Sequence, residues 1–170
     1  KDCGVSCLLS IVRFYGGYVT REYLRDITKT TSSGVSVYSL VEAGEKLGFE
    51  TKALKGQITK FKETDFPMIA HVLLNKRIGH FVVIEKINSK GITIMDPNSG
   101  FRKLSFEDWK NITTNVYILY KPKMKILKQD KETTFWQFLV PILKRYKYSF
   151  LLVLFFSIIY TICNILLSYQ

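Results

Sequence analysis

Three residue types that together carry out nucleophilic catalysis occur in this chain in the order cysteine, histidine, aspartate. Cys3 precedes the segment GVSCLLSIVRFY, His80 begins the apolar run of GHFVVIEKI, and Asp96 ends GITIMD. The first segment has helical spacing, and the positive end of a helix dipole stabilises a thiolate. An imidazole beside a thiol acts as a general base, and a carboxylate holds that imidazole in the required tautomer. The residue types and their order therefore predict a catalytic site of Cys3, His80 and Asp96.

Each of these residues also has a purely structural interpretation. Cys3 is equally well explained as a small buried side chain, and Asp96 as the start of a tight turn, DPNSG. Cys7 lies one helical turn after Cys3, and we expect it to be a core residue. Together with His71 and His80 the two thiols would supply four zinc ligands, but their spacing is not C-x-x-C. We therefore expect no metal site.

Two further polar residues compete for catalytic roles. His71, in PMIAHVLL, is an alternative base. No aspartate follows it on a neighbouring hairpin, so we interpret it as a strand residue. Asp2 directly precedes Cys3, where a carboxylate would raise the pKa of the thiol, so we expect it to support the helix N-terminus instead.

The elements that must position the site are the two strands that contain His80 and Asp96, joined by the turn Asn88–Gly91. A regular two-residue turn places Asp96 opposite Val83, on the face away from His80. A three-residue turn or a bulge places Asp96 opposite Val82, diagonal to His80 on the same face. The catalytic assignment therefore predicts an irregular hairpin, and the glycine that ends the turn favours one.

The wider pattern predicts an α+β fold, because helical periodicity comes first and strand periodicity follows. Thr20, Ser36 and Ser105 are the expected N-caps, and Gly48 the expected left-handed end of a helix. We expect helices over 4–15, 21–27, 37–47 and 105–112, and strands over 49–54, 68–74, 80–87, 92–96 and 116–120.

Composition indicates a globular domain with an apolar segment attached. Of the 170 residues, 47% are hydrophobic, and 25 basic residues against 14 acidic ones give a net charge of +11. These values exclude a disordered or collagen-like chain, and three cysteines exclude a disulfide-stapled scaffold. Residues 148–170 contain no charge and are long enough to cross a bilayer, which takes about 20 apolar residues. Basic residues precede them, and the positive-inside rule places that flank in the cytoplasm.

The domain organisation follows from the changes in charge and hydrophobicity along the chain. We expect a globular domain over residues 1–120, a basic linker over 121–134, an interfacial helix over 135–147 and a transmembrane helix over 148–170. The alternative for the last segment is a buried helix of a soluble core. Anionic lipids account for the basic excess, and no motif indicates nucleic-acid binding. Because the chain begins with Lys1 and ends near the close of one span, we expect a segment of a longer protein.

The segments DCGVSCLLSIVRFYG, GHFVVIEKI and MDPNSGFRKLSFEDWK resemble the bacteriocin-processing peptidase domain at the N-terminus of peptidase-containing bacterial ABC exporters. The resemblance covers residues 1–120, and the segments that follow resemble the entry into the transmembrane domain of the exporter. It implies a papain-like cysteine peptidase, with N-terminal helices packed on an antiparallel sheet. Cys3 would be the nucleophile, His80 the base and then the acid, and Asp96 the residue that orients His80.

The resemblance also implies a substrate and partners. Such domains cleave a leader peptide after a Gly-Gly pair on the cytoplasmic side, and the exporter, multi-pass in the bacterial cell membrane, carries the mature peptide across with ATP. The expected partners are the leader-containing precursor, the membrane and, in the full-length exporter, a second copy. No cofactor is expected in this chain: ATP would bind a nucleotide-binding domain outside it, because no G-x-x-x-x-G-K-[ST] motif occurs.

Two features qualify the expected activity. The family has a Gln before the Cys as an oxyanion-hole donor, whereas only Lys1 and Asp2 precede Cys3 here; the backbone N–H of Cys3 can still donate. A channel too narrow for a Cβ would select Gly-Gly, and a shallow apolar surface would receive the leader helix. The alternative function is a catalytically silent leader-docking module, which the presence of Cys3, His80 and Asp96 disfavours.

Overall fold

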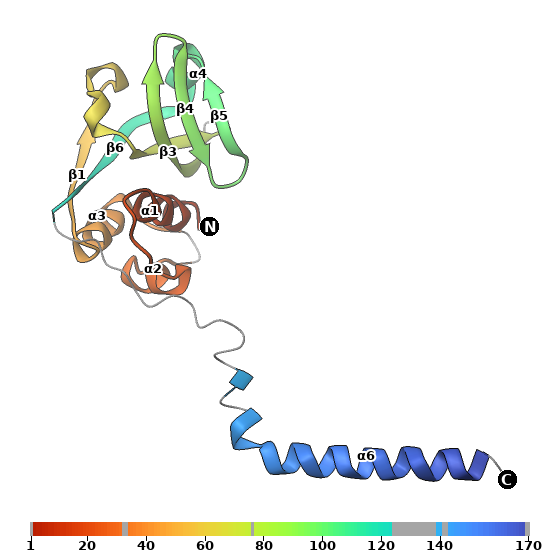
Figure 1. Cartoon of the computed structure of the whole chain (residues 1–170). Coiled ribbons are helices and arrows are strands. Elements are labelled where there is room, and N and C mark those ends of the chain that lie inside the picture. The colour runs from red at the N-terminus through yellow and green to blue at the C-terminus, as the bar shows by residue number, and fades with distance from the viewer. Residues whose placement is uncertain (1, 32–33, 76, 124–138, 141–142, 169–170) are drawn as a thin grey trace. The chain divides into compact units, whose positions relative to one another are not determined.

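The computed structural model describes residues 2–31, 34–75, 77–123, 139–140 and 143–168. The chain divides into two compact units, residues 1–130 and 131–170. The first unit places its helices before most of its strands, as the sequence predicts (Figure 1). The helices α1, α2, α3 and α4 span Cys3–Phe14, Arg21–Ile27, Val37–Lys46 and Phe106–Ile112.

Side-chain caps start three of these helices, and all three were predicted. The hydroxyl oxygens of Thr20, Ser36 and Ser105 accept hydrogen bonds from backbone N–H groups three residues later, at 3.0–3.2 Å. Such bonds satisfy donors that a helix N-terminus leaves free. Gly48, with a φ of 95°, follows α3 in the left-handed conformation that was predicted there.

Six antiparallel strands form one sheet in the order β1-β6-β2-β3-β4-β5. The strands β1 to β6 span Phe49–Lys55, Met68–Leu74, Ile78–Asn88, Gly91–Asp96, Gly100–Leu104 and Thr113–Pro122, and two short 3-10 helices span Ile58–Lys60 and Glu63–Asp65. The sequence analysis did not predict β5 or the 3-10 helices. Strand β5 lies at the sheet edge with mostly exposed residues, so it lacks the apolar alternation by which a strand is recognised. Strand β6 extends to Pro122, into the start of the expected linker.

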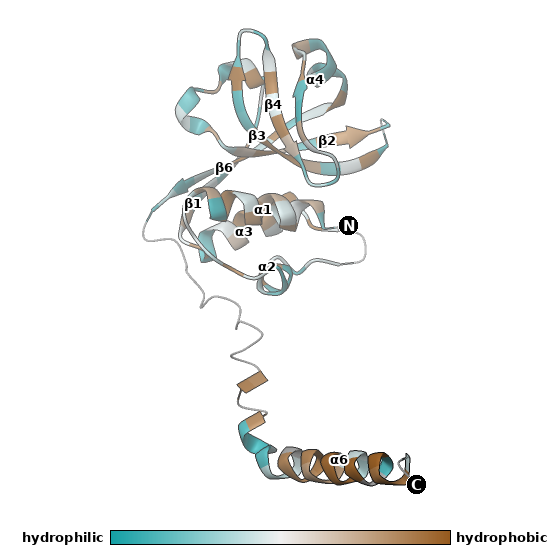
Figure 2. Ribbon diagram, turned by 45° about the vertical axis from the view of Figure 1, so that its right-hand side comes forward, coloured by the Kyte–Doolittle hydropathy of each residue, from teal (hydrophilic) through white to brown (hydrophobic). Residues whose placement is uncertain are grey.

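The two faces of the sheet carry separate hydrophobic cores. Helices α1 and α3 cover one face, where Leu8 and Ile11 of α1 lie in one core with Phe81 and Val83 of β3, and α2 packs against these two helices on the side away from the sheet (Figure 2). On the other face, Trp109 of α4 packs with residues of β2, β3, β4 and β6. Helix α1 therefore crosses the sheet beside β3, which brings the start of α1 close to the start of β3.

The hairpin of β3 and β4 is irregular, which confirms the prediction. Its turn has two residues, because Asn88 pairs with Gly91, but the register shifts at Glu85. Val83 pairs with Met95 beyond the shift, which puts Asp96 opposite Val82. The irregularity is a bulge, one of the two predicted possibilities, and it lies at Glu85 within β3 rather than at Gly91.

The second unit contains the helix α6, Lys147–Ser168. It is long and apolar enough to span a membrane by length and composition, and it is the one such helix within the described part of the chain. Its 22 residues correspond to about 33 Å, against about 30 Å for a bilayer core. The side chains described for it are exposed. Of the expected interfacial helix, residues 139–140 and 143–147 are described and are mostly helical, and α6 begins within this segment, at Lys147. Residues 135–138 and 141–142 and most of the linker lie outside the described residues.

Candidate active site

Cys3 is the first residue of α1, where the helix dipole and free N–H groups meet its sulfur. The next residue, Gly4, fits tightly against the loop before α3. A Cβ added to Gly4 would lie 2.3 Å from Cγ1 of Val35 and 3.2 Å from Cδ2 of Phe81. Only a glycine after the cysteine therefore lets the first turn of α1 approach that loop and β3.

His80 lies near the start of β3 and forms a buried hydrogen bond with Asp96, at the end of β4. The His80 Nε2–H donates to Oδ1 of Asp96 at 2.9 Å, and the two side chains are 5% and 8% exposed. The bulge at Glu85 makes this diagonal pairing possible. Because Nε2 faces Asp96, Nδ1 is the ring nitrogen of His80 left to interact with Cys3.

Asp96 is held as a carboxylate by its own turn. The Asn98 backbone N–H donates to Oδ1 and the Ser99 hydroxyl donates to Oδ2, both at 2.9 Å. Burial raises the pKa of Asp96, but these bonds and His80 outweigh it, so its pKa is lowered. DPNSG is therefore both a tight turn and part of the site, because the turn supplies the hydrogen-bond donors to Asp96.

Cys3 and His80 shift the pKa values of one another in opposite directions. Burial raises the pKa of Cys3, but the hydrogen bond with His80, the Phe81 N–H and the imidazole charge lower it overall. The hydrogen bond with Cys3 raises the pKa of His80 against burial, and Asp96 adds to the increase. Both shifts favour a thiolate beside an imidazolium, which is the nucleophile that cysteine chemistry needs.

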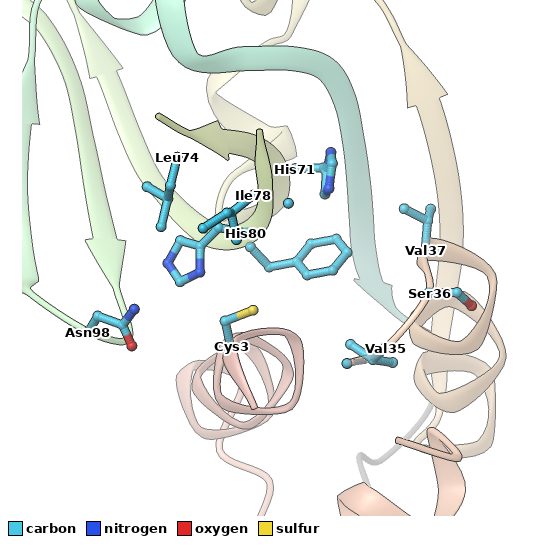
Figure 3. Close-up of a pocket in the computed structure, with 12 residues that line it drawn as sticks. Cys3, Val35, Ser36, Val37, His71, Leu74, Ile78, His80 and Asn98 are labelled. Carbon is cyan, nitrogen blue, oxygen red and sulfur yellow. The ribbon is translucent and has the colours of Figure 1, made fainter. Parts of the chain in front are cut away.

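Cys3 and His80 open into a cleft of about 590 Å³. Figure 3 shows two arms on either side of Cys3: His80 and Asn98 lie on one side, and the loop before α3 lies on the other. The cleft is lined by residues of α1, of the loop before α3 and its first turn, of the β2–β3 hairpin and of the β4–β5 turn: Cys3, Gly34, Val35, Ser36, Val37, His71, Leu74, Ile78, Gly79, His80, Phe81 and Asn98.

The remaining candidates have other environments. Cys7 is fully buried in the core, as predicted, and burial raises its pKa well above its usual value. Asp2 occupies the N-cap position of α1, but it makes no capping bond and pairs with Arg25 of α2 instead. Asp2 therefore lies at the helix N-terminus, as expected, but its side chain pairs with Arg25 rather than capping the helix. Within the described residues, no group of three or more His, Cys, Asp or Glu side chains is placed to hold a metal.

Several cleft residues were not found from the sequence. Val35 of the loop, Val37 at the start of α3 and the glycine Gly79 carried no catalytic signal. Ser99, which does not line the cleft but donates to Asp96, was quoted only as part of a turn. Val35 and Gly79 contribute shape rather than functional groups, and that shape depends on tertiary contacts. The only sequence signal was local: Asn98 and Ser99 lie two and three residues after an aspartate that ends a strand, as donors in an Asx turn do.

The site consists of a half-buried thiol at a helix start and a strand histidine that an aspartate orients. This arrangement is that of a cysteine peptidase, here on a fold of helices and an antiparallel sheet. Residues 1–125 match the model of the peptidase C39 family, and the chain belongs to this family. It is the cysteine peptidase domain that occurs in processing and transport ABC proteins.

Curated relatives and solved structures agree with this assignment. The lactococcin-G-processing and transport ATP-binding protein LagD of Lactococcus lactis is 32% identical over 146 residues, which are 82% of this chain and 21% of the relative. The transport/processing ATP-binding protein ComA of Streptococcus pneumoniae is 31% identical over 99% of this chain and 24% of its own length. The chain thus spans about a quarter of these relatives.

Two solved structures are similar to the first unit. The peptidase domain of Streptococcus ComA has a TM-score of 0.66 at 34% identity, covering 71% of this chain and 91% of that one. A double glycine motif protease from an AMS/PCAT transporter, solved with a leader peptide, has a TM-score of 0.64 at 27% identity, covering 71% and 84%.

Proposed function

We propose that residues 1–120 form a cytoplasmic leader peptidase, which cleaves after a Gly-Gly pair in the precursor of a bacteriocin or signalling peptide. Cys3 is the nucleophile, His80 the general base and acid, and Asp96 the residue that orients His80. The observation that carries the proposal is the hydrogen-bonded line from Cys3 through His80 to Asp96, at the centre of an open cleft.

The mechanism follows from the positions of these groups. The Cys3 thiolate attacks the carbonyl carbon of the second glycine, and the backbone N–H of Cys3, which lies before the first intrahelical bond of α1, donates to the oxyanion. The His80 imidazolium then gives its Nδ1 proton to the leaving amine as the C–N bond breaks. The thioester is hydrolysed by a water that His80 deprotonates, which releases the leader carboxylate and restores the Cys3–His80 pair.

This proton transfer fixes the direction of the substrate. The leaving amine must lie next to His80, so the mature peptide leaves along the arm that ends at Asn98. The leader then occupies the arm between Val35, Val37 and the start of β3, on the other side of Cys3 (Figure 3).

We infer that Gly-Gly selectivity arises in the leader arm. Beside Cys3, the Val35 and Phe81 side chains crowd Gly4, and farther along the cleft His71 lies over Gly79. In the proposal, the walls that these contacts bring together leave no room for a Cβ on the substrate. An extended dipeptide without side chains passes between the walls.

The longer protein would couple cleavage to export. We propose that α6 begins its transmembrane domain, with the peptidase on the cytoplasmic side because Lys144, Arg145 and Lys147 flank α6 at that end. The full-length relatives are named as ATP-binding transport proteins. On that basis the parent protein is a homodimeric exporter that uses ATP in a domain outside this chain.

The test uses the 170-residue chain in detergent micelles and a synthetic leader that ends in Gly-Gly followed by a short cargo. Mass spectrometry should detect cleavage after the second glycine, and Cys3→Ala should abolish it. Cys7→Ala is the matched control, because it removes a thiol from the same helix but from the core rather than the cleft. If wild type and Cys3→Ala both bind the leader and neither cleaves it, the domain is a docking module and the catalytic assignments fail.

A further inference from the structure

His71 is the titratable side chain in the cleft that the proposed mechanism leaves unused. It lies on β2 opposite Phe81 of β3, and its ring packs edge-on against the Phe81 ring at 5.1 Å between centroids. Gly79 is its diagonal neighbour across the same strand pair. All three residues line the cleft.

The hydrogen bonds of His71 determine which ring nitrogen carries the proton. Thr114 Oγ1 lies 2.9 Å from the carbonyl oxygen of His71, so its single hydroxyl proton is donated there. The same Oγ1 lies 3.0 Å from Nδ1 of His71 and can therefore only accept from it. Nδ1 carries the hydrogen, and burial together with the charge of His80 lowers the pKa of His71, which keeps the ring neutral. Nε2 is consequently a bare acceptor.

This acceptor faces the substrate path. A Cβ built on Gly79 would lie 2.9 Å from Nε2 of His71, so Nε2 sits directly over the glycine that precedes His80. Figure 3 shows the His71 ring on the same side of His80 as the loop before α3, which is the leader arm. Among the described residues, Nε2 has no hydrogen-bond partner.

We propose that Nε2 of His71 accepts a hydrogen bond from a backbone N–H of the leader, within the glycine-containing segment just before the scissile bond. His71 is then a positioning residue that binds the peptide backbone, and Gly79, which has no Cβ, leaves room for the His71 ring at the edge of the cleft. Recognition of this kind favours an extended segment with a free N–H and disfavours proline or an N-alkylated residue there. The inference rests on the proposed function and names a contact of that same site.

Two substitutions at position 71 separate this role from a structural one. In His71→Gln the amide at the end of the side chain reaches the place of Nε2 and can present an acceptor to the cleft. In His71→Asn the amide reaches only the place of Nδ1, so it keeps a partner for Thr114 but leaves the cleft without an acceptor. We expect His71→Asn to lower kcat/KM about 3–10-fold and His71→Gln to retain most of it, the range for one neutral hydrogen bond.

The decisive experiment combines these variants with ester substrates. Three leader peptides each replace one N–H of the three residues before the scissile bond with an ester oxygen, by using a hydroxy acid. With wild type, one of the ester peptides should have a kcat/KM about 3–10-fold lower than that of the amide peptide. With His71→Asn, the same ester peptide and the amide peptide should have equal kcat/KM values. If every ester peptide loses the same factor with wild type and with His71→Asn, the proposed contact does not exist.

Binding measurements distinguish failure of this contact from failure of the proposed function. In a Cys3→Ala background, the affinity of the same amide and ester peptides is measured without cleavage, with the full chain in micelles. A loss of affinity for one ester peptide that disappears with His71→Asn supports the contact even if wild type does not cleave. A wild type that neither binds nor cleaves the amide peptide overturns both the proposed function and this inference.

Discussion

At the scale of single residues, the site depends on how one proton is shared between Cys3 and His80. The pKa of the thiol is lowered and that of the imidazole is raised, so the thiolate–imidazolium pair exists between the two coupled titrations. Below that window the thiol is protonated and does not attack. Above it the imidazole has lost the proton that the leaving amine needs, so cleavage should fall on both sides.

Replacing His80 should therefore raise the pKa of Cys3. In His80→Ala the hydrogen bond and the positive charge disappear, while burial, which raises the pKa, remains. Alkylation by iodoacetamide should be fast for wild type below the usual thiol pKa. For His80→Ala the inflection should move to higher pH, with about a tenfold lower rate at pH 7 for each unit of pKa increase. Cys3→Ala gives the background, and an unchanged inflection would show that His80 does not activate the thiol.

The sequence predicted the residues that supply functional groups to the site, but not the residues that determine the shape of the cleft. Cys3, His80 and Asp96 could be proposed from type, order and element boundaries, and the structure places them together. The close contact between Val35 and Gly4 could not, because it exists only after the loop before α3 folds onto α1. The same limit applied to the fold, where capped helices and apolar strands were predicted but the polar edge strand β5 was not.

At the scale of elements, the bulge at Glu85 decides which face of the hairpin Asp96 occupies. Between the turn and the site, β3 contains one residue more than β4 can pair with. The bulge absorbs this residue, so Ile84 and Ile87 both face the core and Asp96 lies diagonal to His80. The catalytic geometry therefore depends on the relative lengths of two strands.

Deletions in the two strands should have opposite outcomes. Removing the exposed Glu85 leaves equal strand lengths and a regular hairpin with the same pairing, so the variant should keep about a tenth or more of the wild-type kcat/KM. Removing Thr93 from β4 increases the mismatch, and kcat/KM should fall about 100-fold or more, as when an acid–base group is lost. Circular dichroism would verify that both variants fold. Equal losses in the two variants would contradict this account of the bulge.

At the scale of the whole molecule, one chain joins a water-exposed peptidase unit to a helix that suits a bilayer. The peptidase unit has two hydrophobic cores of its own, and α6 exposes apolar side chains along its length. In water these side chains would favour aggregation, whereas in a membrane their transfer is favourable. We therefore expect the peptidase unit to be stable in water and α6 to be stable in a bilayer.

Flotation with liposomes tests this division. The chain should float with vesicles at about 1 M salt, where the Debye length is about 3 Å and attraction between Lys/Arg and lipid is screened. Phe156→Lys combined with Ile159→Lys should stop flotation, because two lysines near the helix centre cost about 5–7 kcal/mol of insertion free energy. The matched control changes both residues to leucine and should float like wild type. Flotation of the lysine variant would mean that other residues bind the membrane.

The lowered pKa of Cys3 has a further consequence, which concerns oxidation. A partly exposed thiol with thiolate character reacts with peroxide to give a sulfenic acid, and a second thiolate normally resolves this product. Cys7 lies one turn farther along α1, but it is fully buried and its raised pKa keeps it protonated. Cys7 therefore cannot resolve oxidised Cys3, and we expect small thiols from solution to reduce it. The redox poise of its compartment thus limits where this peptidase can act, just as the apolar helix limits which surface it can occupy.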